Sequence, residues 1–259
     1  MHHRGPLTVH QFPCLSDNYG FLVRDEATGA VATIDTPDAD VIIKEAESLG
    51  WRVDLVLNTH WHPDHAGGNR AVADHFGAEI IAPVAEGNKI PEKDRQVDDG
   101  ATVMLGETAF DVVAVPGHTL GHIAYLVRPA KTAFVGDTLF SLGCGRLFEG
   151  TPEQMWTSLL KLRALPDDTM IFCAHEYTAA NAAFAITIEP DNEALAARVD
   201  EISKLRLIEQ PTVPVLLGAE KATNPFLRAD VPDVKAALSM TDAPDHEVFG
   251  EIRSRKDNF

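Results

Sequence analysis

Four side chains that can bind a metal ion occur within six residues of this sequence. They are His60, His62, Asp64 and His65, in the string THWHPDH that begins at Thr59. Imidazole is a good ligand for zinc and similar first-row metals, and a carboxylate adds charge and can bridge two ions. His60 and His62 could serve one ion, and Asp64 and His65 could serve a second. Neither ion would be complete, so the pattern requires further ligands elsewhere in the chain.

The segments on either side of this string indicate how it is held. Residues 53–58 (VDLVLN) form a pattern typical of a buried strand, and Gly67-Gly68-Asn69 can turn the chain into a helix. The candidate ligands therefore lie on a loop at the end of a strand, where a rigid scaffold can direct several side chains to one point.

Three more candidate ligands follow apolar strand patterns. His118 comes after VPG, Asp137 after FVG and His175 after FCA. A single His or Asp at a strand end is more often a helix cap or a solvated loop residue, but three of them behind a string of four make seven candidate ligands, enough for two ions. His122 is expected to be structural, orienting a ligand. The histidines without such a context are expected at the surface, and they are His2, His3, His10, His75 and His246.

The elements that must position these residues can be predicted from periodicity. Short apolar or alternating runs, bounded by Gly, Pro or Asp, predict strands at 7–12, 20–23, 30–34, 53–57, 79–82, 102–105, 110–115, 123–127, 132–135 and 170–173. Leu105–Thr108 is typical of a hairpin turn. Helical patterns occupy 39–49, 68–76 and 152–164, the last with Pro152 at its first position. Many strands with few helices predict an α/β sandwich of sheets covered by helices.

The character of the sequence changes after His175. Helical patterns occupy 178–188, 192–210, 231–240 and 246–256, and 211–225 is predicted to be irregular. The predicted organisation is a catalytic domain over 1–175 and a smaller, mostly helical domain over 176–259.

Composition limits the function classes. The chain has 22 Lys and Arg against 39 Asp and Glu, a net charge of −17, which disfavours binding to nucleic acid. An anionic substrate would need a local cluster of cations. The cysteines Cys14, Cys144 and Cys173 are odd in number and form no CxxC pair, so a reducing, cytoplasmic location is expected. No apolar signal core or membrane-spanning run is present, so neither export nor membrane insertion is expected.

The chain resembles the metallo-β-lactamase superfamily, and within it glyoxalase II, the hydroxyacylglutathione hydrolases. The superfamily resemblance rests on THWHPDH and on His118, Asp137 and His175 with their preceding residues. The glyoxalase II resemblance rests on longer segments that together span residue 14 to the last residue. These segments are CLSDNY from Cys14, GDTLF from Gly136, GCGRLFEG from Gly143, AHEYT from Ala174, NPFLR from Asn224 and IRSRKDNF from Ile252.

The resemblance implies a fold and a metal site. The fold would be a four-layer αββα sandwich followed by a helical domain. His60, His62 and His118 would bind the first ion. Asp64, His65 and His175 would bind the second, and Asp137 would bridge both. Asp64 and Asp137 would take part in catalysis. The cofactor would be two divalent ions per chain, zinc first, with iron or manganese as alternatives.

The resemblance also implies a substrate, S-D-lactoylglutathione, hydrolysed to D-lactate and glutathione in methylglyoxal detoxification. The chain is expected to act as a monomer. The residues implied to bind it are Arg146, Leu147, Phe148, His175, Tyr177, Arg253 and Lys256. Related sequences often have Lys where this chain has Arg146, and Tyr where it has Phe148. Arg keeps the charge, but Phe148 lacks a hydroxyl, which puts one hydrogen bond to the peptide in doubt.

The basic pair near the C-terminus can also be interpreted from the residues alone. Arg253 and Lys256 are three apart in a predicted helix, so they share a face and could hold a carboxylate. The alternative is that basic residues simply favour a helix C-terminus.

Several other functions share parts of this pattern. A β-lactamase or lactonase would use the same fold, and a persulfide dioxygenase would share the His-rich string with a single iron. A structural metal module is disfavoured because closed zinc sites are usually rich in Cys. A nuclease acting on RNA is disfavoured by the acidic charge. For a hydrolase, the expected nucleophile is a metal-activated hydroxide, because none of the cysteines has the context of a catalytic thiol.

Overall fold

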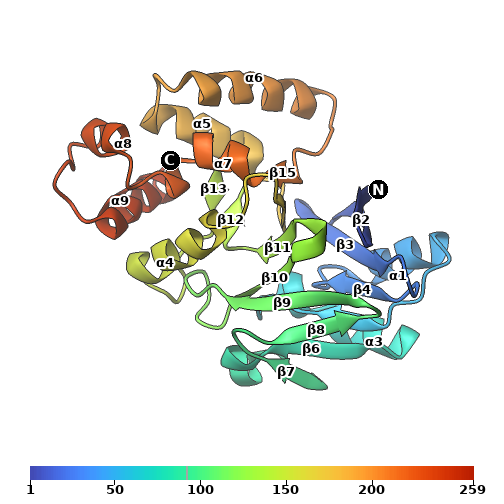
Figure 1. Cartoon of the computed structure of the whole chain (residues 1–259). Coiled ribbons are helices and arrows are strands. Elements are labelled where there is room, and N and C mark those ends of the chain that lie inside the picture. Colours follow the sequence, from blue (N-terminus) through green and yellow to red (C-terminus); the bar gives the residue numbers. More distant parts are fainter. Residues whose placement is uncertain (92) are drawn as a thin grey trace. The chain divides into compact units, whose positions relative to one another are not determined.

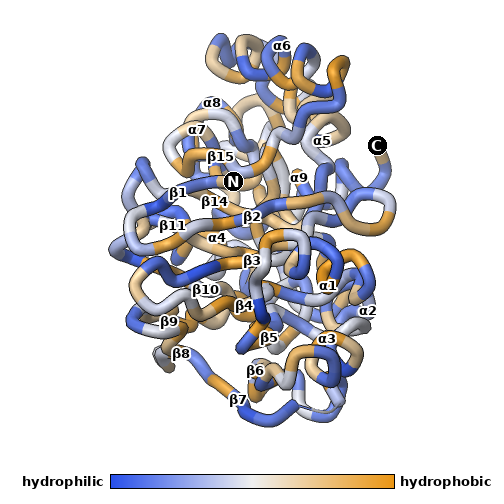
Figure 2. Tube along the Cα trace, turned by 90° about the vertical axis from the view of Figure 1, so that its right-hand side faces the viewer, coloured by the Kyte–Doolittle hydropathy of each residue, from blue (hydrophilic) through white to orange (hydrophobic). Residues whose placement is uncertain are grey.

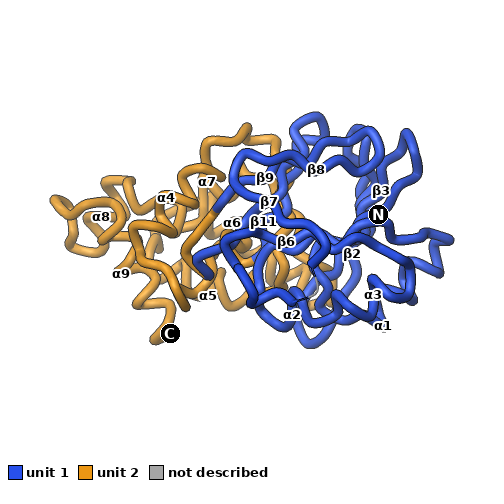
Figure 3. The backbone as a smooth tube through the Cα atoms, turned by 90° about the horizontal axis from the view of Figure 1, so that it is seen from below, with its two compact units in different colours: residues 1–114, 119–136 blue, residues 115–118, 137–259 orange. Residues whose placement is uncertain are grey.

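The computed structural model describes residues 1–91 and 93–259. The chain divides into two compact units (Figure 3). Unit 1 comprises Met1–Ala114 and Thr119–Gly136, and unit 2 comprises Val115–His118 and Asp137–Phe259.

A seven-stranded sheet forms the first part of unit 1, with its strands in sequence order. Strands β2, β3, β4, β6 and β7 of this sheet are labelled in Figure 1. Strands β1 to β4 pair antiparallel, and β4 to β7 pair parallel. The sheet is therefore mixed, as expected for a fold that does not alternate strictly. The strands are β1 (His2–Arg4), β2 (Leu7–Cys14), β3 (Asn18–Asp25), β4 (Val31–Ile34), β5 (Leu55–Leu57), β6 (Glu79–Pro83) and β7 (Arg95–Val97).

A second, antiparallel arrangement of strands follows in unit 1, in the order β8, β9, β10, β11. The strands are β8 (Thr102–Leu105), β9 (Thr108–Ala114), β10 (Ile123–Val127) and β11 (Thr132–Gly136). Leu105 pairs with Thr108, so Gly106 and Glu107 form the predicted two-residue hairpin turn, with Gly106 in the left-handed region at φ 57°.

Apolar packing joins the layers of unit 1. Helices α1 (Ala39–Ser48) and α3 (Asn69–Phe76) bury Ile42 and Val72 against Val56 and other residues of the seven-stranded sheet. Phe21 on β3 contacts Phe134 on β11, with ring centroids 5.9 Å apart. Unit 1 is thus a helical layer and two sheets. Its other helices are short, namely α2 (Pro63–Ala66), η1 (Val84–Lys89) and η2 (Arg128–Ala130).

Unit 2 is mostly helical. Its helices are α4 (Pro152–Arg163), α5 (Thr178–Ile188), α6 (Glu193–Leu207), α7 (Leu217–Thr223), η3 (Pro225–Leu227), α8 (Pro232–Ala237) and α9 (Asp245–Asp257). Its strands are β12 (Leu139–Phe140), β13 (Gly143–Cys144), β14 (Met170–Cys173) and β15 (Val215–Leu216). Thr151 caps α4 in a capping box with Gln154, and Pro152 follows, as the sequence indicates. Figure 2 shows hydrophilic and hydrophobic residues interspersed along α6. Its Leu195 and Ile202 pack with Ala182 and Ala185 of α5.

One prediction for this region was wrong. Residues 211–225 were expected to be irregular, but they contain β15, α7 and the start of η3. The segment contains prolines at 211, 214 and 225, which favour an irregular prediction. Between the last two lies a short run of good helix formers, AEKA, which forms part of α7. Helix α6 also ends at Leu207 and α8 at Ala237, each three residues earlier than expected.

Within the part of the chain that the structure describes, no helix is both long and apolar enough to cross a membrane.

Candidate metal centre

The His-rich string lies directly after β5, as predicted. Its second half is a single helical turn, α2, with His62 at the N-cap position. His60 and His65 are buried, while His62 and Asp64 are partly exposed. Asn18 donates a hydrogen bond of 3.1 Å to the Oδ2 atom of Asp64, which fixes the direction of that carboxylate.

The side chains of the string form two pairs. His60 Nε2 lies 3.0 Å from His62 Nδ1, and His65 Nε2 lies 3.5 Å from Asp64 Oδ2. Two ligand atoms on one tetrahedral ion, each about 2.0–2.1 Å from it, are about 3.3 Å apart. Each pair therefore has the spacing of two ligands on a common ion.

Asp35 holds this arrangement in place, and the sequence analysis did not identify it. It is buried and accepts hydrogen bonds from the Thr59 backbone N–H (2.7 Å), the Thr59 hydroxyl (2.7 Å) and His65 Nδ1 (2.8 Å). Asp35, His60 and His65 lie close enough together to hold a metal ion. Because the Asp35 oxygens already accept these three bonds, we interpret it as the residue that fixes the ring of His65 with Nε2 available as a ligand. The available signal was its position directly after the apolar strand β4.

His60 is oriented from two sides. The Thr59 hydroxyl lies 3.1 Å from His60 Nδ1, and the ring of His122 stacks on the His60 ring with centroids 4.5 Å apart. His122 is fully buried, so its role agrees with the structural one predicted. Gly136 makes room for it, because a Cβ there would lie 2.7 Å from the His122 ring, and its φ is 48°.

Unit 2 brings the three remaining candidate ligands together. His118 Nε2 lies 3.4 Å from Asp137 Oδ2, and His175 Nε2 lies 3.4 Å from Asp137 Oδ1. All three side chains are buried. Each carboxylate oxygen thus faces a different histidine at a distance typical of two ligands on one ion, the arrangement a carboxylate needs to serve two ions at once.

The segment after β13 orients His118. Its Nδ1 lies 2.9 Å from the carbonyl oxygen of Arg146, which leaves Nε2 directed at Asp137. Gly145 allows this close approach, since a Cβ there would lie 2.0 Å from the Asp137 carbonyl oxygen. The backbone contact that orients His118 therefore also fixes the position of Arg146.

The predicted substrate-binding aromatic residues lie beside these ligands. Tyr177 stacks on the ring of His175, with centroids 4.7 Å apart and an angle of 4° between the planes. Phe148 contacts the edge of the His118 ring at 5.2 Å. Phe148 is 62% and Tyr177 38% exposed, so both present apolar surface to solvent beside buried histidines. Leu147, which precedes Phe148, is partly buried.

The basic pair lies on α9, as predicted. Arg253 is only 6% exposed, and its Nη1 donates to the Cys144 carbonyl oxygen at 2.9 Å. Lys256 donates to the Ala180 carbonyl oxygen at 3.0 Å and lies over the rings of Phe184 and Phe259. Burial and the charges of Arg253 and Arg146 lower the pKa of Lys256. These three cations therefore form a positive cluster in an acidic chain.

A buried polar network holds the β12–β13 hairpin that leads to Arg146. Asn224 donates to the carbonyl oxygens of Phe140 (3.1 Å) and Gly143 (3.0 Å). Glu220 accepts from the Leu142 backbone N–H at 2.9 Å and from Asn224 at 2.8 Å, and it is paired with Arg198. The NPFLR segment thus acts by fixing a hairpin, which its sequence alone did not indicate.

The three thiols are unsuited to nucleophilic attack. All are buried, and burial raises the pKa of Cys144 to about 11 and those of Cys14 and Cys173 to about 12. A thiol in this state is almost entirely protonated at neutral pH. This agrees with the prediction that no cysteine acts as the nucleophile.

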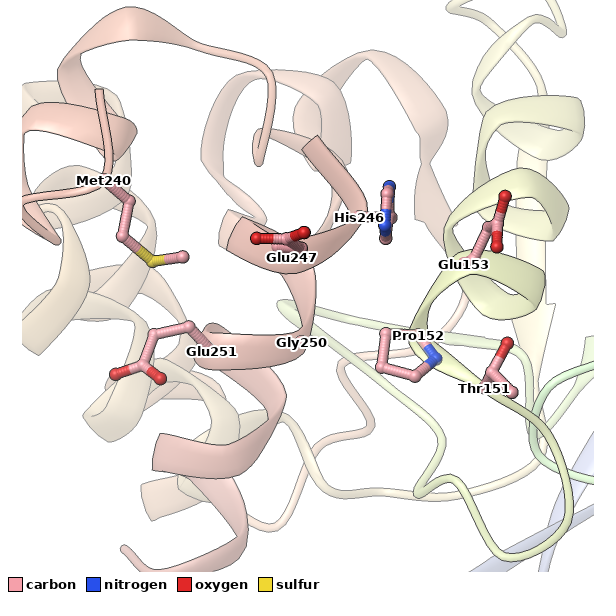
Figure 4. Close-up of a pocket in the computed structure, with 8 residues that line it drawn as sticks. All are labelled: Thr151, Pro152, Glu153, Met240, His246, Glu247, Gly250 and Glu251. Carbon is pink, nitrogen blue, oxygen red and sulfur yellow. The ribbon is translucent and has the colours of Figure 1, made fainter. Parts of the chain in front are cut away.

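An open hollow of about 540 Å³ in unit 2 lies between the N-terminus of α4 and helix α9 (Figure 4). It is lined by the carboxylates of Glu153, Glu247 and Glu251 together with His246, and by none of the predicted site residues. Three acidic groups would repel an anionic ligand, so this hollow is unsuited to a peptide thioester.

Comparison with known proteins gives the family context. The model of the metallo-beta-lactamase superfamily matches residues 28–175, and that of the hydroxyacylglutathione hydrolase C-terminus matches residues 176–259. A hydroxyacylglutathione hydrolase of Maricaulis maris (strain MCS10) is 53% identical over 253 residues, covering 98% of this chain and 99% of the relative. A protein of the same name from Erythrobacter litoralis (strain HTCC2594) is 54% identical, covering 98% and 100%.

A solved structure, that of ETHE1 from Myxococcus xanthus, is similar in fold, with a TM-score of 0.67, 24% identity and coverage of 96% of this chain and 98% of that one. The fold predicted from the sequence is therefore confirmed as the metallo-β-lactamase fold followed by a C-terminal segment of the hydroxyacylglutathione hydrolase type.

Proposed function

The chain belongs to the hydroxyacylglutathione hydrolase family of the metallo-β-lactamase superfamily, and we propose on this premise that it hydrolyses S-(2-hydroxyacyl)glutathione thioesters. The specific substrate proposed is S-D-lactoylglutathione, cleaved to glutathione and D-lactate as the second step of methylglyoxal detoxification. The observation that carries the proposal is the carboxylate of Asp137, each oxygen of which faces a different buried histidine.

We propose the ligand sets that the family resemblance implies, and the pairs observed within each unit support them. The pair His60 and His62, with His118, is proposed to hold the first ion. The pair Asp64 and His65, with His175, is proposed to hold the second, and Asp137 to bridge them. Nitrogen and oxygen ligands suit zinc first, with iron or manganese as alternatives.

Such ions would supply a hydroxide at neutral pH and polarise the thioester carbonyl. The residues of the chain fix where that chemistry occurs. Asp35 and Thr59 hold the rings of His65 and His60, and the Arg146 carbonyl oxygen holds that of His118. Because these partners set the ring orientations in advance, each ring would present its ligand atom without reorganisation during the reaction. The leaving group is a thiolate, so no protein acid is needed to expel it.

Substrate recognition is proposed for the exposed aromatic residues and the cation cluster. Tyr177, Phe148 and Leu147 would offer apolar surface to the peptide, with His175 at the reacting end. Arg146, Arg253 and Lys256 would bind its carboxylates. The lack of a hydroxyl on Phe148 leaves apolar contact as the role of that side chain.

The thioester proposal is tested by an assay against a panel of substrates with the metal content measured on the same sample. The panel contains S-D-lactoylglutathione, other glutathione thioesters, β-lactams, lactones and, with oxygen uptake as the readout, glutathione persulfide. Hydrolysis of the lactoyl thioester should exceed all others. A metal-loaded protein that does not cleave it refutes the proposed function.

Replacing Lys256 with Met tests the cation cluster. Met keeps an unbranched apolar side chain and removes the charged Nζ that lies over the Phe184 ring, so the KM for S-D-lactoylglutathione should rise about tenfold with kcat unchanged. Steady-state kinetics measures both. Lys235→Met is the matched control, because Lys235 pairs with Asp245 on α9 and is not among the residues assigned to the substrate. Equal KM values for the Lys256 variant and the parent would contradict this role.

The proposed organisation is a catalytic domain over 1–175 and a substrate-binding domain over 176–259, in a monomer. Within the catalytic domain, Arg146, Leu147, Phe148 and His175 would also contact the substrate. The three cysteines are buried free thiols, which is consistent with the proposed cytoplasmic location.

A further inference from the structure

The cation cluster already contains a carboxylate of the chain itself. Asp257, the last residue of α9, accepts a hydrogen bond of 2.8 Å from Arg253 Nη2. The same oxygen, Oδ1, lies 3.8 Å from Arg146 Nε. One carboxylate oxygen therefore faces the two arginines that the proposed function assigns to substrate carboxylates.

We propose that Asp257 is an internal competitor for this site: its carboxylate occupies the cation cluster when no ligand is bound, and a carboxylate of the glutathione moiety displaces it. The inference rests on the proposed function for the identity of the ligand. It adds a residue that sets affinity for the substrate and speeds release of the glutathione product.

In this ion pair the Arg253 side chain is fixed, whereas the Asp257 side chain can move. Arg253 is held by the Cys144 carbonyl oxygen and lies over the Phe226 ring at 5.1 Å, so its guanidinium is fixed. The Asp257 side chain is 41% exposed and lies at the end of its helix. Only the carboxylate of this ion pair is exposed, so water screens it and can replace Arg253 as its partner when the Asp257 side chain turns into solvent.

The position of Asp257 in the helix is unfavourable in itself. A carboxylate at a helix C-terminus faces the negative end of the helix dipole, where cations are the favoured residues. Arg253, four residues earlier, and Arg146 offset this. A bound ligand carboxylate would accept hydrogen bonds from the same two guanidinium groups. Asp257 and the ligand therefore cannot both form all of their hydrogen bonds at once.

The charges indicate the direction of the effect. The cluster has three cations, Arg146, Arg253 and Lys256, and one carboxylate, Asp257. Their mutual proximity is reflected in the pKa of Lys256, which burial and the two arginines lower and Asp257 raises. Without Asp257 the cluster would hold three positive charges without an internal partner and should attract an anion more strongly.

The test is a calorimetric titration of the purified, metal-loaded protein with glutathione. Asp257→Asn should lower the Kd for glutathione about two- to fivefold, the size expected when competition from an exposed ion pair is removed. The inhibition constant of glutathione as a product should fall in parallel. Asp257→Glu, which restores a carboxylate, should return the Kd towards that of the parent.

Glu251→Gln is the matched control, because it removes the same charge from the same helix, where Glu251 pairs with the exposed Arg255. It should leave the Kd unchanged. If Asp257 is merely structural, the Asp257→Asn variant should have a lower melting temperature and an unchanged or higher Kd for glutathione. Either Kd result overturns the proposal. Failure of both the parent and the Asp257→Asn variant to bind glutathione also overturns it. Hydrolysis by the parent chain is scored separately, so its absence would refute the proposed function while the Kd comparison still decides the role of Asp257.

Discussion

Asp137→Asn is expected to lower kcat for thioester hydrolysis by about 10³-fold or more, corresponding to about 4 kcal/mol of lost transition-state stabilisation. Asp137 is the residue whose two oxygens face His118 and His175 at 3.4 Å each. An amide has one oxygen and a neutral nitrogen donor, so it cannot present two anionic ligand atoms. The variant should bind about one ion per chain, against the two proposed for the parent, measured by elemental analysis beside the steady-state kinetics.

Asp167→Asn is the appropriate control for this experiment. Asp167 is 76% exposed and pairs with Lys221 at the surface of unit 2, so it carries the same charge change without touching the ligands. It should keep two ions and full activity. An Asp137 variant with two ions and undiminished kcat would show that the carboxylate does not bridge, and the proposed dinuclear assignment would fall.

The sequence indicated most of the scaffold because its strands are buried on at least one face. Ile123–Val127 and Met170–Cys173 were predicted with their observed bounds, since continuous Val, Ile and Phe runs between turn residues are typical of buried strands. Short strands without such runs were not predicted. Gly143–Cys144 pairs through only two residues, and its stability comes from Asn224 and Glu220, which lie some eighty residues further along the chain.

The ligands could be predicted because each lies at a strand end or in a dense string. The groups that orient them could not, since their role depends on contacts between distant residues. Asp35 holds His65 across 30 positions, and the Arg146 carbonyl oxygen holds His118 across 28. Every residue has a backbone carbonyl, so the residue type at position 146 does not indicate that its carbonyl oxygen orients a histidine. Asp257 was unrecognised for a related reason: a basic pair at a helix end does not indicate which acidic neighbour already occupies it.

Removing the metal ions is expected to abolish hydrolysis, and the way activity returns should distinguish one ion from two. The seven proposed ligands are histidines and aspartates, which cannot attack a thioester at a useful rate, and the thiols are buried and protonated. After treatment with a strong chelator and desalting, the apoprotein should have less than about 10⁻³ of the parent activity. Zinc added back stepwise should restore little activity with the first equivalent and most with the second, because each pair of ligands needs its own ion.

Circular dichroism of the apoprotein controls for unfolding, since a folded but inactive protein assigns the loss to the ions. Full recovery at one equivalent would favour a single-ion enzyme, and activity in a protein shown to be free of metal would exclude metal-activated water as the nucleophile.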